Sequence, residues 1–356
     1  MNRPPARDLH VGLIVPGLQG GVDEAAHYIA KGNEFAHIDL KLYQTKGLSS
    51  WRAPFKFAVT LTQIVIDRLR GNLDVAHVNV SANGSTLRKV MISGLLRIVR
   101  VPYIVQVHSG RYERFWDSLP TIGKTLVRPM FRHASRTVVL GHPFSALFVS
   151  KVGVDSERLA IVPNGVPVPR QPTRQNIETP TILFLGRLDQ NKGYRDLLAA
   201  LHHCIDLNWT AILMGDGETD HADALVERYG LGERVTVRDW TERTLVNEVI
   251  QTASILVSPS YSEGLSLTLL EAMAHGLACI ATPVGGHRDV LVDEHNSLVV
   301  QPGQIDHLSK ALRRLVTDHD LRTELGTAAR KTITLRCSLT LICAKLEETY
   351  RNAVNE

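Results

Sequence analysis

Short runs of β-branched residues alternate with longer stretches of helical spacing along the whole chain. In the first half each apolar run is bounded by Gly, Pro, Asn or Ser, as buried strands are. The stretches between them carry apolar residues three or four positions apart, the spacing of one helix face. This alternation predicts right-handed βαβ units around a parallel sheet. The predicted strands are 9–15, 38–43, 74–80, 103–107, 137–140 and 159–162, and the predicted helices are 22–31, 54–70, 84–99, 121–133 and 143–151.

The same alternation restarts after a proline-rich stretch. Pro163, Pro167 and Pro169 lie close together, and proline fits neither a helix interior nor a central strand. Because the polar stretch 170–180 follows, we expect a linker that ends near Thr179. Beyond it the predicted strands are 181–185, 210–214, 234–237, 255–258, 278–281 and 297–300, and the predicted helices are 194–205, 221–229, 242–252, 267–275, 305–317 and 321–335.

The pattern predicts an α/β fold of two tandem Rossmann-like, doubly wound domains. With 44% hydrophobic residues, the 356-residue chain can bury two cores. Domains of this kind bind ligands at the carboxyl ends of their strands, so we expect the ligand in an interdomain cleft. The terminal segment 338–353 has a helix-forming composition.

The N-terminal segment and the cysteines bear on the cellular compartment. The chain starts with a polar segment, and the apolar run 11–15 is too short for a signal peptide or a membrane span. We therefore expect a cytoplasmic protein. The four cysteines lack the spacing of a zinc site or a disulfide framework, so we expect packed, reduced thiols. They are Cys204, Cys279, Cys337 and Cys343.

The net charge of +4 hides an asymmetry. Residues 1–166 carry 21 Lys and Arg against 11 Asp and Glu, and the remainder carries 19 against 25. A basic half suits nucleic acid, an anionic membrane surface or an anionic substrate, and it also fits charge that is merely solvated. The chain shows no recognised nucleic-acid module, so no nucleic-acid partner is expected.

Two segments of the basic half could rest on an anionic membrane. The stretch 87–100 is apolar with four cations, and 51–57 is rich in aromatic residues. The alternative is that Leu95, Ile98 and Val99 simply face the sheet.

The segment 260–276 carries the densest candidate chemistry. It follows the predicted strand 255–258 and opens a helix, with Ser266 in the position of an N-cap. The backbone N–H groups of Leu267 and Thr268 then lie at a positive helix end, where a diphosphate can be held.

Two glutamates frame this helix start. Glu263 lies in the loop before the helix, and Glu271, eight positions on, lies about one turn inside it. A carboxylate in the second position suits a ribose diol, because it accepts from two hydroxyl donors. The spacing alone fits a solvated helix start equally well.

Two cations follow the strand that ends at Gly186. Arg187 offers a planar fork of donors and Lys192 a mobile point charge, so that together they can neutralise a leaving diphosphate. After the next strand, Gly215 and Gly217 flank Asp216 in a loop that could be an ordinary turn.

The first half carries a glycine loop and a histidine. Gly20 and Gly21 join the first strand to the first helix and let the backbone approach a ligand closely. The loop does not match G-x-G-x-x-G, so a nicotinamide cofactor is disfavoured. His108 follows the strand 103–107 and would face the cleft.

These strings resemble family 4 glycosyltransferases, the retaining group 1 enzymes of the GT-B fold. Glu-Gly-Leu-Ser and Leu-Glu-Ala-Met-Ala-x-Gly around Glu263 and Glu271 match the E-x7-E signature of the family. Gly-Arg-Leu…Lys-Gly at 186–193 and Asn-Gly-Val at 164–166 extend the resemblance over nearly the whole chain. The chain departs from the family at Ser109, where Asp or Gly is commoner, and at Asp289, where Glu is usual.

The resemblance implies a division of labour between domains. Residues 1–167 would form the acceptor-binding domain, and 168–335 would bind the nucleotide-sugar. In the family, a C-terminal helix such as 336–356 packs back on the N-terminal domain.

The resemblance also implies residue roles. Arg187 and Lys192 would be catalytic through the diphosphate, with Glu263 orienting the donor sugar and His108 approaching it near the reacting carbon. Donor binding would fall to Gly20, Gly21, Gly215, Ser266, Leu267, Thr268 and Glu271.

No metal or other cofactor is expected, because a helix end with Arg and Lys can substitute for an ion. Asp318-His319-Asp320 resembles a D-x-D motif, but it lies far from the other motifs and Asp320 suits an N-cap. His202, His203 and Cys204 are adjacent on a helix and point in different directions.

The sequence therefore predicts a glycosyltransferase that moves a sugar from a nucleotide diphosphate-sugar to a glycan or lipid-linked acceptor, in bacterial envelope or exopolysaccharide synthesis. A peripheral location on the inner face of the cell membrane would suit such an acceptor. A nucleotide-sugar epimerase of the same fold and a non-catalytic nucleotide-binding module are the alternatives. The donor base, the sugar and the linkage are not specified by the sequence.

Overall fold

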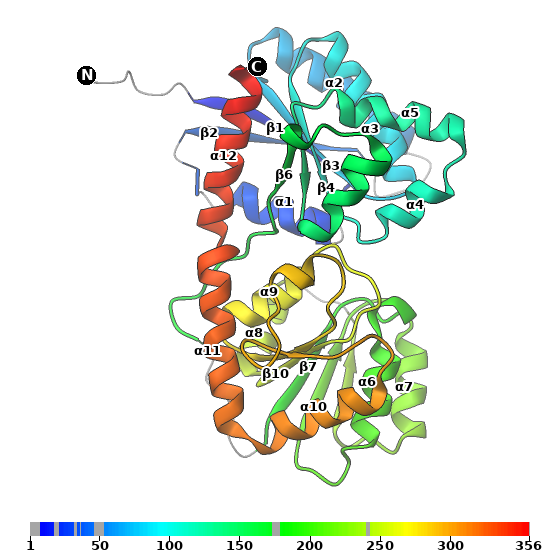
Figure 1. Ribbon diagram of the computed structural model, residues 1–356, viewed down its shortest axis with the longest axis vertical. Helices are drawn as coiled ribbons and strands as arrows, with labels where there is room; N and C mark the ends of the chain where they lie inside the picture. The colour runs from blue at the N-terminus through cyan, green and yellow to red at the C-terminus, as the bar shows by residue number, and fades with distance from the viewer. Residues whose placement is uncertain are drawn as a thin grey trace, which may run out of the picture. The chain divides into compact units, whose positions relative to one another are not determined.

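A computed structural model describes residues 8–355, except 18–20, 32–33, 36, 46–52, 173–178 and 240–242. Contacts divide the chain into two compact units (Figure 1). Unit 1 comprises Met1–Gly165 and Leu339–Glu356, and unit 2 comprises Val166–Ser338.

Unit 1 is built on a six-stranded sheet with the order β2-β1-β3-β4-β5-β6, in which all pairs are parallel. The chain moves from β1 outward to β2 and then returns to the other side of β1 as β3. Strand ends at such a switch point leave room for a ligand. The strands are β1 (Leu9–Val15), β2 (Ile38–Gln44), β3 (Val75–Val80), β4 (Tyr103–Val107), β5 (Arg136–Val139) and β6 (Leu159–Ile161).

Helices cover both faces of this sheet, because successive side chains of a strand point to opposite faces. Leu13 belongs to the core that includes residues of α1 and α12, and its neighbour Ile14 belongs to the core that includes residues of α2, α3 and α5. The helices are α1 (Gly21–Lys31), α2 (Ala53–Leu69), α3 (Gly84–Ile98), α4 (Tyr112–Ser118), α5 (Thr121–Arg132) and α12 (Leu339–Asn355).

The C-terminal helix α12 is part of unit 1 through apolar packing and one buried polar contact. Ile342, Leu346 and Tyr350 are buried in the core that contains β1. The hydroxyl of Tyr350 shares a 2.7 Å hydrogen bond with Nδ1 of His77 on β3. Burial lowers the pKa of His77 to about 3, with a smaller contribution from His108, so this imidazole is neutral at physiological pH.

Unit 2 repeats the plan with a second parallel sheet, in the order β12-β11-β10-β7-β8-β9. Ile182 and Phe184 of β7 point into a core shared with α6, α7 and α10. In Figure 1, α8 and α9 lie on the opposite side of the sheet. The strands are β7 (Thr181–Leu185), β8 (Thr210–Met214), β9 (Val235–Arg238), β10 (Ile255–Ser258), β11 (Ala278–Ala281) and β12 (Leu298–Val299). The helices are α6 (Tyr194–His202), α7 (Thr219–Arg228), α8 (Arg243–Thr252), α9 (Leu267–Ala274), α10 (Ile305–Thr317) and α11 (His319–Arg336).

The predicted α/β fold with two parallel, doubly wound sheets is confirmed, and every predicted strand is present with ends that differ by at most one residue. The sequence did not predict α4, a short helix that buries Tyr112 and Trp116, one turn apart. The predicted helix 143–151 is wrong in type: a 3₁₀ turn (His142–Phe144) precedes a π-helix (Leu147–Val152).

The N-cap predicted at Asp320 is also wrong. Asp318 caps α11, because its carboxylate accepts the backbone N–H of Leu321, three residues on. Asp320 lies inside the first turn, where its charge still favours the helix N-terminus.

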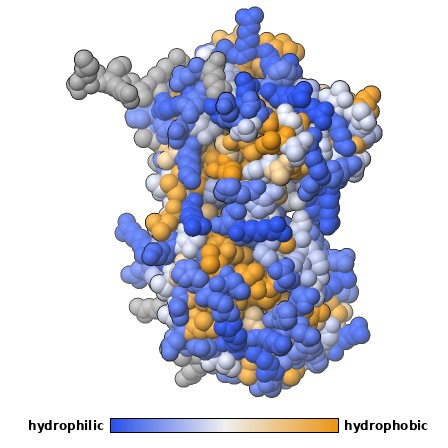
Figure 2. Space-filling view, viewed as in Figure 1, coloured by the Kyte–Doolittle hydropathy of each residue, from blue (hydrophilic) through white to orange (hydrophobic). Residues whose placement is uncertain are grey.

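Hydrophilic residues dominate the face shown in Figure 2, and apolar residues form smaller patches between them. None of the described helices combines the length and the hydropathy that a membrane crossing requires. All four cysteines are buried, as their scattered spacing led us to expect.

The contact between His77 and Tyr350 should contribute measurably to the stability of unit 1. We expect Tyr350→Phe to lower the free energy of unfolding by about 1–3 kcal/mol, because it leaves a buried imidazole nitrogen without its hydroxyl partner. Urea unfolding measures the change. The half-exposed Val354 on the same helix provides the control, and Val354→Ala should stay within about 0.5 kcal/mol of wild type. Equal stabilities for Tyr350→Phe and wild type would contradict this assignment.

Candidate functional site

Most of the residues predicted to bind the donor lie near the carboxyl ends of neighbouring strands in unit 2. Loops 186–193, 215–218, 259–266 and 282–287 follow β7, β8, β10 and β11, and these strands are adjacent in the order β11-β10-β7-β8. Carboxyl ends of parallel strands lie at one edge of a sheet, so these loops meet there.

Lys192 and Glu263 form the central ion pair of this edge. The Nζ of Lys192 donates to Oε1 of Glu263 at 2.6 Å, and the two side chains are 27% and 11% exposed. The hydroxyl of Ser260 donates to the same oxygen at 2.7 Å. Lys192 keeps further N–H donors for another anion, because an ammonium group has three.

Hydrogen bonds and a close backbone approach hold the two loops of this ion pair together. The amide Nδ2 of Asn191 donates to the carbonyl of Ser262 at 3.0 Å, and the carbonyl of Asn191 accepts the N–H of Tyr261 at 2.7 Å. Gly193 has φ 74°, and a Cβ there would overlap the carbonyl oxygen of Pro259. A side chain at position 193 would therefore push the two loops apart.

His287 holds the following part of the loop in place. Its Nδ1–H donates to the carbonyl of Thr282 at 3.0 Å, so Nε2 is the atom that accepts the backbone N–H of Ser266 at 3.3 Å. Burial lowers the pKa of His287, which keeps the ring neutral and Nε2 able to accept. Gly285 packs against the carbonyl of Glu263 so closely that a Cβ would overlap it.

The start of α9 has the geometry that the sequence predicted. Ser266 is the N-cap, and its hydroxyl accepts the N–H of Leu269 at 3.4 Å. The hydroxyl of Thr268 contacts that of Ser266 at 2.9 Å and donates to the carbonyl of Leu185, the last residue of β7, at 3.3 Å. Leu267 opens the helix, and Glu271 lies one turn inside it, only 4% exposed.

The β7 and β8 loops approach each other through backbone contacts. A Cβ on Gly215 would overlap the carbonyl of Gly186, so the two backbones touch. Arg187 is exposed, and its Nε lies 3.9 Å from a carboxylate oxygen of Asp189. The structure thus brings Lys192, Glu263, Ser266, Leu267, Thr268 and Glu271 to one edge of unit 2, with Arg187 and Gly215 on the adjoining loops.

Charge compensation decides the ionisation of Glu263. Burial alone would raise the pKa of this carboxyl, but the charge of Lys192 and the hydrogen bonds from Lys192 and Ser260 outweigh burial, so the pKa is lowered. Glu263 is therefore a carboxylate at neutral pH. Among the described residues, no three His, Cys, Asp or Glu side chains gather as a metal site would require.

In unit 1, His108 is oriented by a neighbour on the adjacent strand. Its Nε2–H donates to Oδ1 of Asn79 at 2.7 Å, and Nδ2 of Asn79 donates to the carbonyl of Ile14 at 3.3 Å. Because the Ile14 carbonyl fixes which end of the amide faces His108, the tautomer is fixed too, and Nδ1 carries the lone pair. Burial lowers the pKa of His108 to about 4, so the ring is neutral at physiological pH.

Sequence reasoning missed four residues of these sites: Asn79, Asn191, Ser260 and His287. Asn79, Asn191 and His287 act on residues that are distant in sequence, so their roles depend on how the strands are paired. Ser260 contacts Glu263 three residues on, within one loop. Of the predicted residues, Gly20 lies outside the described residues, and Gly21 is the first residue of α1.

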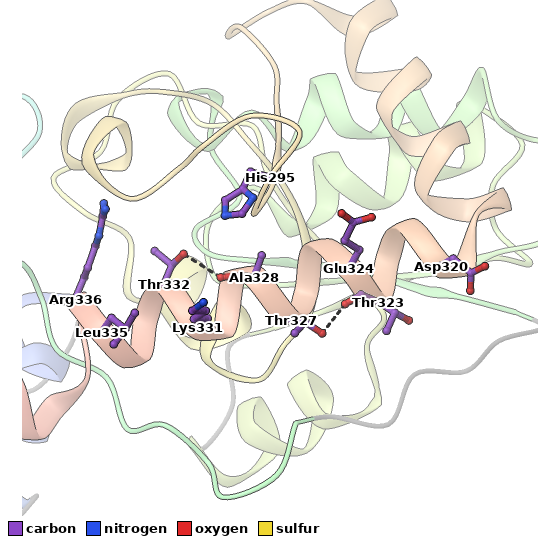
Figure 3. Close-up of a pocket in the computed structure, with 10 residues that line it drawn as sticks. All are labelled: His295, Asp320, Thr323, Glu324, Thr327, Ala328, Lys331, Thr332, Leu335 and Arg336. Carbon is purple, nitrogen blue, oxygen red and sulfur yellow. Dashed lines mark hydrogen bonds between the residues drawn. The ribbon is translucent and has the colours of Figure 1, made fainter.

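A separate cavity of about 670 Å³ lies along α11 (Figure 3). Its lining residues include none of the predicted ones. Two of its hydroxyls, on Thr327 and Thr332, donate to the carbonyls of Thr323 and Ala328 one turn earlier, so their protons are engaged within the helix. The lining residues are His295, Asp320, Thr323, Glu324, Thr327, Ala328, Lys331, Thr332, Leu335 and Arg336.

Two protein families match the chain, one over each half. Residues 5–165 match the family described as "Glycosyl transferase 4-like domain", and residues 168–332 match "Glycosyl transferases group 1".

Individual relatives agree with these families. The chain is 30% identical over 198 residues to D-inositol 3-phosphate glycosyltransferase from Xylanimonas cellulosilytica, a match that covers 50% of this chain and only 48% of that protein. It is 26% identical over 283 residues to 2-deoxystreptamine glucosyltransferase from Streptomyces kanamyceticus, covering 73% of each. The fold resembles that of Anabaena HepE in complex with UDP-glucose, with a TM-score of 0.75 and 18% identity over 95% of this chain and 98% of that one.

The ion pair between Lys192 and Glu263 makes a pH-dependent contribution to stability. Because the pKa of Glu263 is lowered on folding, this contribution is present above the carboxyl's unfolded value of about 4.3 and is lost as the pH falls through the folded value. We expect Lys192→Met to be destabilised relative to wild type at pH 7 and the gap to shrink below about pH 4. Urea unfolding at both pH values measures it.

Arg195→Met is the matched control, because Arg195 forms an exposed pair with Glu218. Loss of this exposed pair should lower the free energy of unfolding by about 1 kcal/mol or less. A gap for Lys192→Met that is independent of pH would contradict the ion-pair account.

Asn79 should control the titration of His108. We expect Asn79→Asp to raise the pKa of His108 from about 4 towards or beyond its unperturbed value, because a carboxylate stabilises the imidazolium ion. The histidine ring resonances would then titrate between about pH 5 and 8, where the wild-type ring does not. NMR titration measures this shift, and the exposed Asn352→Asp is the control. An unchanged titration in Asn79→Asp would refute the assigned hydrogen bond.

Proposed function

Because this chain belongs to the group 1 glycosyltransferases, which are retaining GT-B enzymes that transfer sugars from nucleotide sugars, we propose that unit 2 binds a nucleotide diphosphate-sugar and unit 1 binds the acceptor. The two family matches confirm the family resemblance that the sequence motifs indicated. The location of the donor in unit 2 rests on one observation: the Lys192 ammonium stands at the same sheet edge as the amide-rich start of α9.

The donor diphosphate would lie between these two groups. Lys192 has N–H donors beyond the one used by Glu263, and the first amides of α9 point towards an anion at the helix N-terminus. Arg187 is exposed on the adjoining loop, and its long side chain can turn to the outer phosphate oxygens. Positive groups at the site therefore meet the charge that develops on the leaving group.

The reaction exchanges one bond at the anomeric carbon for another. The acceptor hydroxyl attacks on the face from which the diphosphate leaves, so the configuration is retained. The bond from the anomeric carbon to the diphosphate oxygen breaks, and that phosphate oxygen takes the proton of the acceptor hydroxyl. The protein contributes positioning and electrostatic stabilisation.

The carboxylates orient the donor. We assign Glu263 to the donor sugar, because Lys192 and Ser260 both contact Oε1 and hold the side chain in one position. Glu271, buried one turn inside α9, is assigned to the ribose hydroxyls. His108 is assigned to the donor sugar near the reacting carbon, where Nδ1 of a neutral ring with a fixed tautomer can accept a hydrogen bond from a sugar hydroxyl.

We propose a glycan or lipid-linked acceptor, with a role in bacterial envelope or exopolysaccharide synthesis. Charge supports this choice: residues 1–166 carry ten more cations than anions, which favours an acceptor that carries or adjoins negative charge. The protein would then act in the cytoplasm, at the inner face of the membrane.

Binding and hydrolysis of UDP-, GDP- and ADP-sugars without acceptor would identify the donor. UDP-glucose is the first choice, because the similar fold of HepE was solved with it. Slow hydrolysis to free sugar supports the transferase, whereas an epimerised nucleotide-sugar would mark an epimerase. Binding with no turnover under any condition would mark a non-catalytic module.

Lys192 and Glu271 should both be essential for turnover. We expect Lys192→Ala and Glu271→Ala each to lower kcat/KM for the correct donor roughly 100- to 1,000-fold, because each removes an interaction with the donor diphosphate or ribose. Steady-state kinetics on folded variants measures the loss. Lys310→Ala and Glu227→Ala change exposed residues on α10 and α7, outside these loops, and should leave the rate unchanged. Near-normal rates for Lys192→Ala and Glu271→Ala would refute the assigned roles.

A further inference from the structure

Three large apolar side chains form an exposed stripe on α3. Leu87, Met91 and Ile98 are 60%, 59% and 80% exposed. They are four and seven positions apart, so they share one face of the helix, and the buried residues Ile92 and Leu96 lie on the opposite face. Ile98 therefore does not face the sheet, although Leu95 and Val99 pack partly against the core.

The neighbouring helix α5 adds two more. Ile122 and Leu126, one turn apart, are 72% and 59% exposed. The helices α3 and α5 are in contact and lie side by side in Figure 1. These five residues, two on α5 and three on α3, are called the apolar face below. Single exposed leucines are common on soluble proteins, but five large apolar side chains exposed on two helices in contact suit a binding surface.

The basic excess of the first half is concentrated in the segment of the chain that contains α3 and α5. Residues 75–154 contain eleven Lys and Arg but only two acidic residues, Glu113 and Asp117. Both acidic residues pair with a single cation, Lys151, at 2.8 and 2.9 Å. Neither α3 nor α5 contains an acidic residue.

Cations also gather where the two helices end. Arg97 of α3 and Arg132 of α5 are exposed and stand near His133, together with Arg158. Burial and these three positive charges lower the pKa of His133. The apolar face is thus bordered by positive charge without nearby compensation from its own helices.

We propose that the apolar face of unit 1 docks on an anionic lipid bilayer. Apolar side chains on such a surface enter the boundary between headgroups and acyl chains, and the bordering arginines meet the negative headgroups. A nucleic acid could bind the cations but would leave the apolar side chains of Leu87, Met91 and Ile98 without an apolar partner. A second copy of this chain would place an equally positive surface against the same face.

The position of the apolar face relates membrane docking to the binding of the acceptor. Helix α3 begins after the carboxyl end of β3, the strand that carries Asn79, the partner of His108. Leu87 lies in the first turn of α3, so the stripe starts at the sheet edge of His108 and runs away from it. Resting on the proposed function, this arrangement would present a lipid-linked acceptor to unit 1 without the acceptor leaving the bilayer.

Vesicle flotation of the full chain tests the proposal. We expect binding to vesicles of phosphatidylcholine mixed with phosphatidylglycerol, and little binding to phosphatidylcholine alone. The variant L87S/M91S/I98S should bind the mixed vesicles about tenfold less or weaker still, because it loses the inserted apolar groups. Even at low salt, the variant R97E/R132E should not bind the mixed vesicles. Binding of the wild type should weaken as salt is added.

Matched changes in unit 2 provide the controls. Leu335→Ser replaces a leucine that is 64% exposed, and Lys310→Glu reverses an exposed cation, and both should float like wild type. Because every substituted residue is exposed, the variants should fold, and circular dichroism checks this.

Several outcomes would overturn the proposal. The first is that wild-type protein does not bind the mixed vesicles, and the second is that L87S/M91S/I98S floats with them as wild type does. The third is that wild type is a dimer in solution and L87S/M91S/I98S alone is not. The fourth is that the protein binds polyuridylate and not vesicles. Donor hydrolysis measured without vesicles separates this test from that of the proposed function, because docking variants should hydrolyse the donor as wild type does. Vesicle binding without any sugar transfer would refute the proposed function and leave the docking surface intact.

Discussion

The ion pair between Lys192 and Glu263 is the interaction on which the site of unit 2 depends. Removing two charges from water is costly, and their attraction offsets that cost only with good geometry and further hydrogen bonds. Here Ser260 supplies such a bond, and Asn191 ties together the two loops that carry the pair. The pair keeps a cation and a carboxylate fixed at the ends of β7 and β10. A donor that contains a diphosphate and a sugar needs a cation and a carboxylate close together. A solvated loop without this ion pair could not hold the two groups in position.

Close backbone contacts between the loops make this arrangement possible, and they require glycine because a Cβ atom would not fit at these positions. Gly193 and Gly285 each press against a carbonyl of the opposite loop. His287 then fixes the entry to α9 by accepting the N–H of Ser266. The same principle operates in unit 1, where Asn79 fixes the tautomer of His108 from the adjacent strand. Asn79 lies on a strand, whereas Asn191 and His287 lie in loops that follow strands, so in both units the order of the strands decides which polar partners meet.

Much of this fold could be predicted from the sequence, because strand and helix signals are local. The β-branched runs located all twelve predicted strands, and the N-cap at Ser266 followed from its position before an apolar helix. Partners set by strand register could not be found in this way: Asn79 meets His108 across β3 and β4, twenty-nine residues away. The exposure of Ile98 was equally undecidable, because an apolar residue at helical spacing can face a core or a partner. Short elements such as α4 carry too few residues for a periodic signal.

The central claim is that the diphosphate of the donor lies between Lys192 and the start of α9. A crystal structure of the chain with UDP tests it most directly. We predict that diphosphate oxygens lie within hydrogen-bonding distance of Nζ of Lys192 and of the backbone amides of Leu267 and Thr268, with the ribose at Glu271. Nucleotide bound in the cavity along α11, or at the carboxyl edge but turned away from both Lys192 and α9, would contradict the account.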